Sequence, residues 1–298
     1  MNGPGPERGP ARAGVRGERV VRKLNRAARG SAPITGTGAA VVVKIGGRAL
    51  EGTHAPAELA AELARPGGVV LVHGGGIEVS AWCARMGIAP AFADGLRVTD
   101  AQTLEVVTAV LAGLANSRLV AQLRARGVDA VGLSALDGGL TTLDPHPDAA
   151  RLGAVGRVRG VDPSLLDTLL AQGRVPVLAS IGAIAGELVN LNADDFAAAL
   201  APALGARDLV LLSDAPGLLL DGAVVPWLPP GALARTLARP EVRDGMRPKL
   251  VAARAALEGG VERVHIASWT GPGTLTRLLA GEGAGTTLIA AAPQAAHG

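Results

Sequence analysis

The 298-residue sequence has no tyrosine, two phenylalanines, three tryptophans and a single cysteine, Cys83. With so few aromatic side chains, the chain lacks a platform on which the bases of single-stranded nucleic acid could stack. One cysteine excludes an internal disulfide and a multi-cysteine metal site, which is typical of proteins in the reducing cytoplasm. No apolar run approaches the ~18 residues of a membrane-spanning helix. We therefore expect a cytoplasmic protein with no nucleic-acid partner and no membrane segment.

Positive charge is concentrated at the N-terminus. Residues 1–38 carry seven arginines and one lysine against two glutamates, whereas the whole chain has a net charge of only +3. The rest of the chain is therefore mildly acidic, and the high isoelectric point does not indicate a nucleic-acid-binding surface. Because residues 1–38 are also rich in glycine and proline, we expect them to form a disordered basic tail.

Lysine is scarce as well, since only Lys23, Lys44 and Lys249 occur among 29 basic residues. Outside the tail, both lysines lie close to glycine or proline. A lysine ammonium is a compact point charge, and an arginine guanidinium does not reproduce its geometry against a phosphate. The persistence of Lys44 and Lys249 in an arginine-rich chain favours a phosphate-binding role for both.

Two glycine turns follow buried strands early in the chain. Residues 69–72 are apolar and predict a strand, His73-Gly74-Gly75-Gly76 predicts a sharp turn, and residues 77–86 predict a helix. The preceding strand, residues 40–44, ends in Lys44-Ile45-Gly46-Gly47. A right-handed βαβ crossover would place both turns at the carboxyl ends of neighbouring parallel strands, where α/β sheets bind ligands. A glycine turn at a helix N-terminus predicts an anion site and favours phosphate as the anion.

The rest of the chain continues to alternate strands with helices, which predicts an α/β fold with a mainly parallel sheet. Thr99 and Gln102 have the spacing of a capping box, so we expect a helix to begin there. Asp221-Gly222 predicts a hairpin turn. The other expected strands lie at residues 130–133, 175–179, 208–213, 264–267 and 286–290. We expect hairpin material or a flap at residues 137–139 and 153–161.

Several polar residues stand at turns or helix starts. Arg97 follows a turn, where a guanidinium could bind a carboxylate or simply be solvated. In Asn190-Leu191-Asn192-Ala193-Asp194, Asn192 is a natural N-cap, and Asp194 could orient the two lysines or a metal-bound phosphate. Lys249 follows Pro248 at the predicted start of a helix.

Six motifs in this order resemble the acetylglutamate kinase branch of the amino-acid kinase family. They are Lys44-Ile45-Gly46-Gly47, His73-Gly74-Gly75-Gly76, Gly95-Leu96-Arg97-Val98-Thr99, Asn190-Leu191-Asn192-Ala193-Asp194, Leu212-Ser213-Asp214 and Gly245-Met246-Arg247-Pro248-Lys249. The resemblance runs from about Val41 to Ile289. It implies a three-layer α/β/α sandwich with a mainly parallel central sheet, an amino-acid-substrate lobe at residues 39–205 and a nucleotide-binding lobe at residues 206–298.

The resemblance also implies a reaction: phosphorylation of the γ-carboxylate of N-acetyl-L-glutamate by ATP with Mg²⁺, in arginine biosynthesis. Lys44 and Lys249 would stabilise the transferring phosphoryl group, and Asp194 would hold both lysines. The remaining implied roles are phosphate binding by Gly47 and Gly75, amino-acid binding by Gly75, Gly76, Arg97 and Asn190, and nucleotide binding by Ser213, Asp214, Ala215, Pro216, Gly217, Leu218, Glu241, Val242 and Arg243. No protein metal ligand is implied.

Other functions fit parts of this pattern. A sister kinase could act on another N-acylated or carrier-bound glutamate or aminoadipate, and a non-catalytic sensor could bind an amino acid or a nucleotide. A dinucleotide-binding oxidoreductase fits poorly, because the glycine loop lacks the G-x-G-x-x-G spacing. For assembly we expect a homodimer without strong arginine inhibition, since residues 20–28 offer few apolar side chains for a helix that would link dimers.

Overall fold

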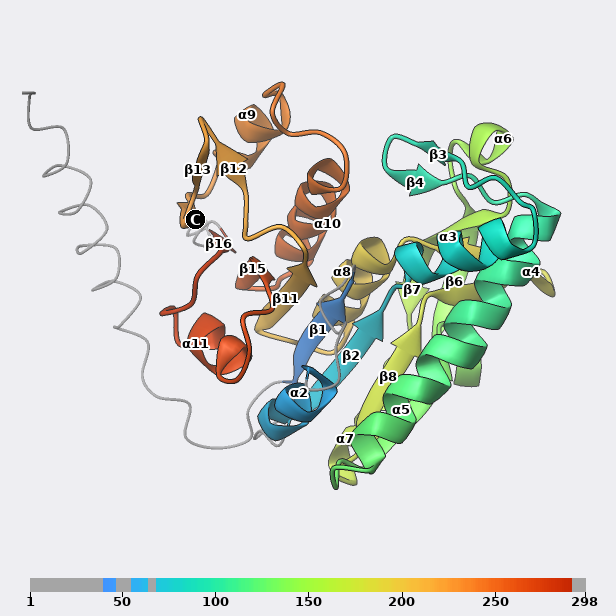
Figure 1. Cartoon of the computed structure of the whole chain (residues 1–298). Helices are drawn as coiled ribbons and strands as arrows, with labels where there is room; N and C mark the ends of the chain where they lie inside the picture. The colour runs from blue at the N-terminus through green and yellow to red at the C-terminus, as the bar shows by residue number, and fades with distance from the viewer. Residues whose placement is uncertain (1–39, 47–54, 64–67, 291–298) are drawn as a thin grey trace, which may run out of the picture. The chain divides into compact units, whose positions relative to one another are not determined.

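The computed structural model describes residues 40–46, 55–63 and 68–290. The expected basic tail and Gly47 lie outside the described residues. An eight-stranded sheet forms the centre of the fold (Figure 1), with the strand order β14-β16-β15-β11-β1-β2-β8-β5. Its strands are β1 (Val41–Ile45), β2 (Val69–His73), β5 (Ala130–Ser134), β8 (Val175–Ala179), β11 (Asp208–Ser213), β14 (Trp227–Leu228), β15 (Arg263–Ser268) and β16 (Thr286–Ile289).

The central strands are parallel, and β16 runs antiparallel to β15. Residues in β2, β8 and β11 are buried throughout, as expected for strands covered on both faces. Alternate side chains enter different cores, so that Val42 belongs to one apolar cluster and Val43 to another. The predicted mainly parallel sheet is confirmed.

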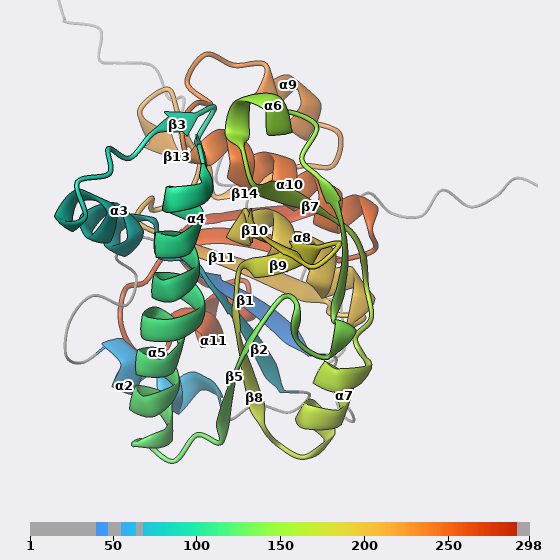
Figure 2. The ribbon, with the colours of Figure 1, turned by 90° about the vertical axis from the view of Figure 1, so that its right-hand side faces the viewer.

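Helices cover both faces of this sheet (Figures 1 and 2). The cluster that contains Val42 is completed by α8 (Ala193–Ala203) and α10 (Met246–Glu258). The cluster that contains Val43 is completed by α2 (Ala55–Leu63), α5 (Asn116–Arg124) and α11 (Thr274–Leu279). The result is the predicted α/β/α sandwich. The smaller helices are α3 (Gly76–Arg85), α6 (Ala149–Leu152), α7 (Ser164–Ala171), α9 (Leu233–Leu237) and a 3-10 turn at Asp137–Gly139.

A second, four-stranded sheet has the order β6-β7-β10-β9. Its strands are β6 (Thr141–Pro145), β7 (Val155–Val161), β9 (Ile181–Ile184) and β10 (Glu187–Leu191). The antiparallel pairing of β7 with β6 confirms the hairpin expected at residues 153–161, whereas residues 137–139 form a 3-10 turn just before β6. The β9–β10 hairpin was not expected from the sequence, because its turn is Ala185-Gly186 rather than an Asn-Gly or Asp-Gly pair. Strand β10 leads directly into α8 and so delivers Asn190 and Asp194 to the same region.

One continuous helix runs from Ala101 to Arg124 through α4 (Ala101–Thr108), a π-helical segment η1 (Ala109–Ala115) and α5. It begins at Asp100, whose side chain accepts a 2.8 Å hydrogen bond from the Thr103 amide. The expected capping box at Thr99 is therefore wrong. Thr99 instead forms a parallel β-bridge with Gly153, and the following residue, Asp100, caps the helix.

By length and composition alone, this 24-residue helix could cross a membrane. One side of it nevertheless packs within the fold: Val106 and Leu111 join a third apolar cluster, and Leu119 and Leu123 join the cluster on the sheet. These contacts are those of a helix that covers a sheet. Two short hairpins complete the described chain, β3 (Phe92–Ala93) with β4 (Leu96–Arg97) and β12 (Leu219–Leu220) with β13 (Ala223–Val224), the latter turning at Asp221-Gly222 as predicted.

Candidate active site

A buried carboxylate holds two lysines at the carboxyl edge of the central sheet. Lys44 Nζ lies 2.8 Å from Asp194 Oδ1, and Lys249 Nζ lies 2.7 Å from Asp194 Oδ2. All three residues are at most 9 % exposed. The two lysines that the sequence singled out thus share one counter-ion, and each takes a different oxygen of it.

Three separate elements supply this cluster. Lys44 is the penultimate residue of β1, between Leu211 of β11 and Val72 of β2. Asp194 stands in the first turn of α8, where the Asn192 side chain caps the helix by accepting from the amides of Asp194 and Asp195. A negative charge is favourable at that helix end. Lys249 lies in the first turn of α10, where the helix dipole disfavours a positive charge. The negative charge of Asp194 compensates for this effect.

Burial and charge oppose each other at these groups. Burial by itself would raise the pKa of Asp194, but the ammonium groups of Lys44 and Lys249 outweigh it and bring the pKa to about 2. Burial lowers the pKa of Lys44, and the neighbouring Lys249 charge adds to that effect while Asp194 opposes it. Asp194 is therefore ionised at neutral pH, and Lys44 has a lower pKa than an exposed lysine.

The two glycine turns meet beside Lys44. The Gly46 amide donates to Leu212 O (3.0 Å), and the Gly74 amide donates to Ile45 O (3.0 Å), which ties each turn to the neighbouring strand. A Cβ added to Gly46 would lie 2.4 Å from Lys44 Nζ, so a side chain there would displace the ammonium. A Cβ on Gly75 would lie 2.7 Å from Leu111 Cδ2. The space beside Gly46 is therefore taken by the buried ammonium, whereas at Gly75 the end of the Leu111 side chain would have to shift.

A pocket of about 180 Å³ opens between these turns and the second sheet. It brings together five of the predicted residues on four segments of the chain: Lys44, Gly75, Gly76, Arg97 and Asn190. Lys249 and Asp194 stand behind Lys44 and do not line the pocket. Its apolar wall comes from Val79, Leu96, Val107, Leu111, Val155 and Leu191.

Arg97 is 8 % exposed and is held on one side only. Its Nη2 donates to Gly76 O (2.7 Å) and to Ser80 Oγ (2.8 Å), and its guanidinium lies over the Phe92 ring. Its Nη1 has no hydrogen-bond partner among the described residues. A buried guanidinium nitrogen without a partner is costly, so an anion entering the pocket would supply the missing acceptor.

The sequence did not indicate three further contributors to this region. Ser180 follows β8 and lines the pocket, and its position at the carboxyl end of a parallel strand was the available signal. Ser80 and Phe92 hold Arg97, and nothing local in the sequence marks them. Asn190 is oriented by donating to Thr99 Oγ1 (3.2 Å).

The residues assigned to the nucleotide lie elsewhere. Ser213 ends β11 next to β1, at the same edge of the sheet as Lys44. The Leu218 amide donates to Thr286 Oγ1 (2.7 Å). Glu241 pairs with Arg239 on the surface, whereas the Val242 side chain is buried. None of these residues lines the pocket described above.

Comparison with known proteins decides the family. The sequence profile described as amino acid kinase family matches residues 39–268. This chain belongs to the amino acid kinase family. Its relatives within the family include proteins named acetylglutamate kinase from Symbiobacterium thermophilum, 41% identical over 85% of this chain and 92% of that protein, and from Rubrobacter xylanophilus, 43% identical over 83% and 95%. The chloroplastic acetylglutamate kinase of Arabidopsis thaliana is 38% identical over 84% of this chain and 75% of that protein.

Solved structures agree with this placement. N-acetylglutamate synthase from Neisseria gonorrhoeae, determined with coenzyme A and N-acetyl-glutamate, superimposes with a TM-score of 0.74 at 29% identity, over 94% of this chain and 64% of that one. The protein smu.665 of Streptococcus mutans superimposes with a TM-score of 0.72 at 26% identity, over 85% and 99%. The chain is thus a kinase by its family and its sequence relatives, and the solved structures agree with the fold.

Proposed function

We propose that the chain transfers the γ-phosphoryl group of ATP to the γ-carboxylate of N-acetyl-L-glutamate, giving N-acetylglutamyl phosphate and ADP. The observation that carries this proposal is the buried Lys44–Asp194–Lys249 cluster next to a pocket in which Arg97 Nη1 lacks a partner. The acetylglutamate kinase names of relatives at about 40% identity over most of the chain support the choice of substrate.

The chemistry requires positioning and positive charge more than covalent catalysis. A γ-carboxylate oxygen attacks the γ-phosphorus in line, and the bond from that phosphorus to the β–γ bridging oxygen breaks, which releases ADP. Negative charge spreads over the equatorial oxygens during this transfer. Lys44 and Lys249 place two ammonium groups at the site, and Asp194 fixes both of them without neutralising either completely.

The pocket offers complementary groups for the amino-acid substrate. Arg97 would bind the α-carboxylate through its unpartnered Nη1, and Asn190 would bind a polar group of the acylated amine. No described residue accepts from the Gly75 or Gly76 amides, which leaves both available to oxygen atoms of the substrate or of the phosphoryl group. Val79 and Leu111 present an apolar wall suited to methylene and acetyl groups. Gly47 would add one more amide.

For ATP, we propose a site over residues 213–218 and 241–243, because Ser213 ends a strand beside the one that carries Lys44. Within the described ranges, no three histidine, cysteine or acidic side chains gather to hold a metal ion. We propose that Mg²⁺ arrives with ATP, because Mg²⁺ is usually held by substrate phosphates together with one or two carboxylates. When bound, Mg²⁺ would neutralise part of the negative charge on the phosphate oxygens.

A substrate panel tests the proposal. We expect ADP release with MgATP to depend on N-acetyl-L-glutamate, and hydroxylamine to trap the acyl phosphate as a hydroxamate. Faster turnover of N-acetyl-L-aminoadipate, N-succinyl-L-glutamate or a carrier-bound glutamate would replace the substrate by that of a sister kinase. Normal ATP binding without ADP release on any of these compounds would indicate a sensor.

We further propose a cytoplasmic homodimer in which residues 1–36 contribute neither to assembly nor to activity. Light scattering of the full chain and of a protein lacking residues 1–36 should give the same dimer mass, with equal kcat. A mass of six chains, or half-inhibition by sub-millimolar arginine, would contradict the proposal.

A further inference from the structure

The glycine turn after β2 is connected to a buried polar pair, His73 and Asn116. Both residues are at most 5 % exposed. His73 Nδ1 lies 3.0 Å from Gly74 O, and His73 Nε2 lies 3.0 Å from Asn116 Nδ2. Neither residue lines the pocket, but Gly74 and the following Gly75 and Gly76 do. The pair therefore adjoins the backbone that lines the pocket.

The contacts of Asn116 determine the protonation of His73. Asn116 Nδ2 also donates to Val177 O (2.9 Å) and approaches Leu133 O (3.3 Å). Carbonyl oxygens only accept hydrogen bonds, so the amide group that faces them is the NH₂. The same NH₂ faces His73 Nε2, which must then carry the lone pair. A neutral imidazole with an unprotonated Nε2 has its proton on Nδ1, and Nδ1 donates to Gly74 O. Burial lowers the pKa of His73, which keeps the ring neutral.

A bonded Gly74 carbonyl fixes the next amide as well. In a trans peptide the C=O of Gly74 and the N–H of Gly75 point in opposite directions within one plane, and the described residues contain no cis peptide. Holding the oxygen toward His73 therefore holds the Gly75 N–H away from it. Leu111 packs against Gly75, and both Leu111 and Asn116 come from the helix that contains the π-helical segment η1. That segment sets the rotation between them, because a π-helical turn shifts the helix register.

We propose that His73 and Asn116 are positioning residues for phosphoryl transfer, which aim the Gly75 amide at the transferring phosphoryl group. This inference rests on the proposed function. Substrate binding depends mainly on Arg97 and Asn190, whereas the Gly75 amide acts where charge develops, so its misalignment lowers kcat with little change in KM.

Two substitutions of the same histidine separate the hydrogen bond from simple packing. In H73N the side-chain amide occupies the place of Nδ1 and can donate to Gly74 O. In H73Q the side chain reaches the place of Nε2 and provides no donor near Gly74. We expect H73N to keep kcat within about threefold of the native value and H73Q to lose at least about tenfold, with the KM of both substrates within threefold. N116A should also lower kcat, but by a smaller factor than H73Q.

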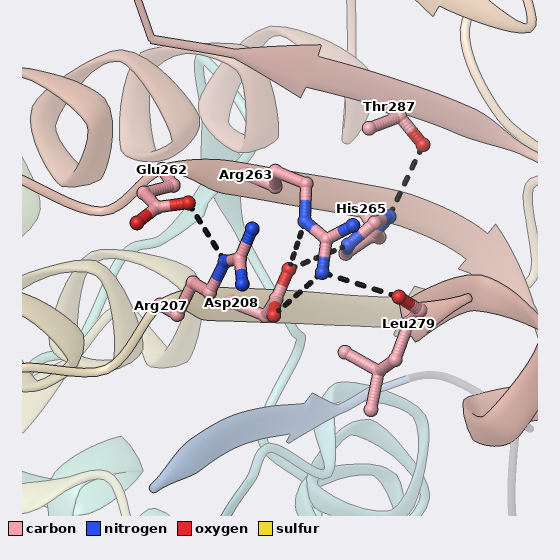
Figure 3. Close-up of polar contacts among 7 residues, drawn as sticks. All are labelled: Arg207, Asp208, Glu262, Arg263, His265, Leu279 and Thr287. Carbon is pink, nitrogen blue, oxygen red and sulfur yellow. Dashed lines mark hydrogen bonds and ion pairs between the residues drawn. The ribbon is translucent and has the colours of Figure 1, made fainter. Parts of the chain in front are cut away.

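The control is His265, a buried histidine that hydrogen-bonds to Asp208 and Thr287 and does not line the pocket (Figure 3). H265N and H265Q should lower the melting temperature yet leave kcat per folded molecule unchanged. A native kcat in H73Q, equal losses in H73N and H73Q, or a loss that resides in KM would overturn the inference.

An experiment without turnover keeps this inference separate from the proposed function. In the full-length protein labelled with ¹⁵N-histidine, the His73 ring should show a protonated Nδ1 and an unprotonated Nε2 at pH 7.5, identified by the signal missing from H73N. The opposite tautomer would overturn the inference even in an active enzyme. The expected tautomer in a protein that phosphorylates no acylated glutamate would sustain the positioning of Gly75 and discard only the proposed reaction.

Discussion

Two buried aspartates, equally shielded from solvent, serve different ends in this molecule. Asp194 and Asp208 are each 5 % exposed, and each is flanked by two nitrogen-bearing side chains. Asp194 binds two lysines that came from distant elements. Asp208 binds Arg263 through both oxygens, at 2.6 and 2.9 Å, and accepts from His265 Nε2 at 3.1 Å (Figure 3).

The difference lies in what remains unsatisfied. Arg263 also donates to Leu279 O, and His265 Nδ1 lies 3.1 Å from Thr287 Oγ1, so the Asp208 cluster joins β11, β15, β16 and the end of α11. A guanidinium fork matches a carboxylate in both donors and locks it. Lysine contacts each Asp194 oxygen singly and keeps other ammonium hydrogens for a ligand.

The two clusters also lie at opposite ends of the parallel strands. Asp208 and Arg263 begin parallel strands, whereas Lys44 stands near the end of one. Parallel α/β sheets bind ligands at the carboxyl ends of their strands. Two features therefore distinguish the Asp194 cluster from the structural Asp208 cluster: it uses lysine rather than arginine, and it lies at the carboxyl ends of the strands.

The largest expected effect comes from removing each carboxylate charge. D194N leaves two lysines buried without a counter-ion, and D208N leaves one arginine, so each should lose about 3–5 kcal/mol of stability. Only D194N should also lower kcat, by about 10³-fold, because both ammonium groups lose their anchor. Enzyme assays corrected for the folded fraction measure this split. Equal kcat losses in the two variants would contradict a catalytic role that is specific to the Asp194 cluster.

The next effect concerns the choice of lysine. K44R and K249R keep the charge but change its geometry, so we expect kcat to fall by about 10²-fold with smaller changes in KM. The reverse change, R263K, should cost stability and leave kcat unchanged. Steady-state kinetics and thermal unfolding distinguish these results, and an unchanged kcat in K44R would remove that lysine from the mechanism.

A smaller effect is expected at Arg97, which we compare with Arg263. Arg97 has an unpartnered Nη1, whereas Arg263 donates to Asp208 and Leu279. R97K should raise the KM for the acylated amino acid by about tenfold and leave the KM for ATP unchanged, because it loses planar recognition of a carboxylate. Initial rates at varied concentrations of each substrate measure this difference. A rise in the KM for ATP would instead place Arg97 at the nucleotide.

The smallest effect is on acid stability. The pKa of Asp194 is about 2 in the fold, against about 3.9 in an unfolded chain. Because the folded value is the lower one, the contribution of Asp194, roughly 2–3 kcal/mol, is present above pH ~4 and is lost progressively as the pH falls toward 2. Thermal unfolding between pH 5 and pH 2.5 should thus depend less steeply on pH in D194N than in the native protein. An identical slope would show that the lysines do not stabilise this carboxylate.

The sequence by itself determined the features that depend on neighbouring residues. The buried strands, both glycine turns, the Asn192 cap and the Asp221-Gly222 hairpin follow from apolar runs, missing Cβ atoms and side-chain-to-backbone hydrogen bonds. The six ordered motifs also sufficed to indicate the family. These are short-range properties, and the rest of the fold leaves them intact.

Only the tertiary structure decided the contacts between distant segments. It moved the helix cap from Thr99 to Asp100 by pairing Thr99 with Gly153, and it formed the β9–β10 hairpin without a typical turn pair. It gave Lys44 and Lys249 one shared carboxylate and left Arg97 Nη1 unpartnered in a pocket. The physical reason is that the pKa of a buried charge, and the partners it finds, depend on which surfaces exclude water around it, and those surfaces exist only after the sheet and its helices have packed.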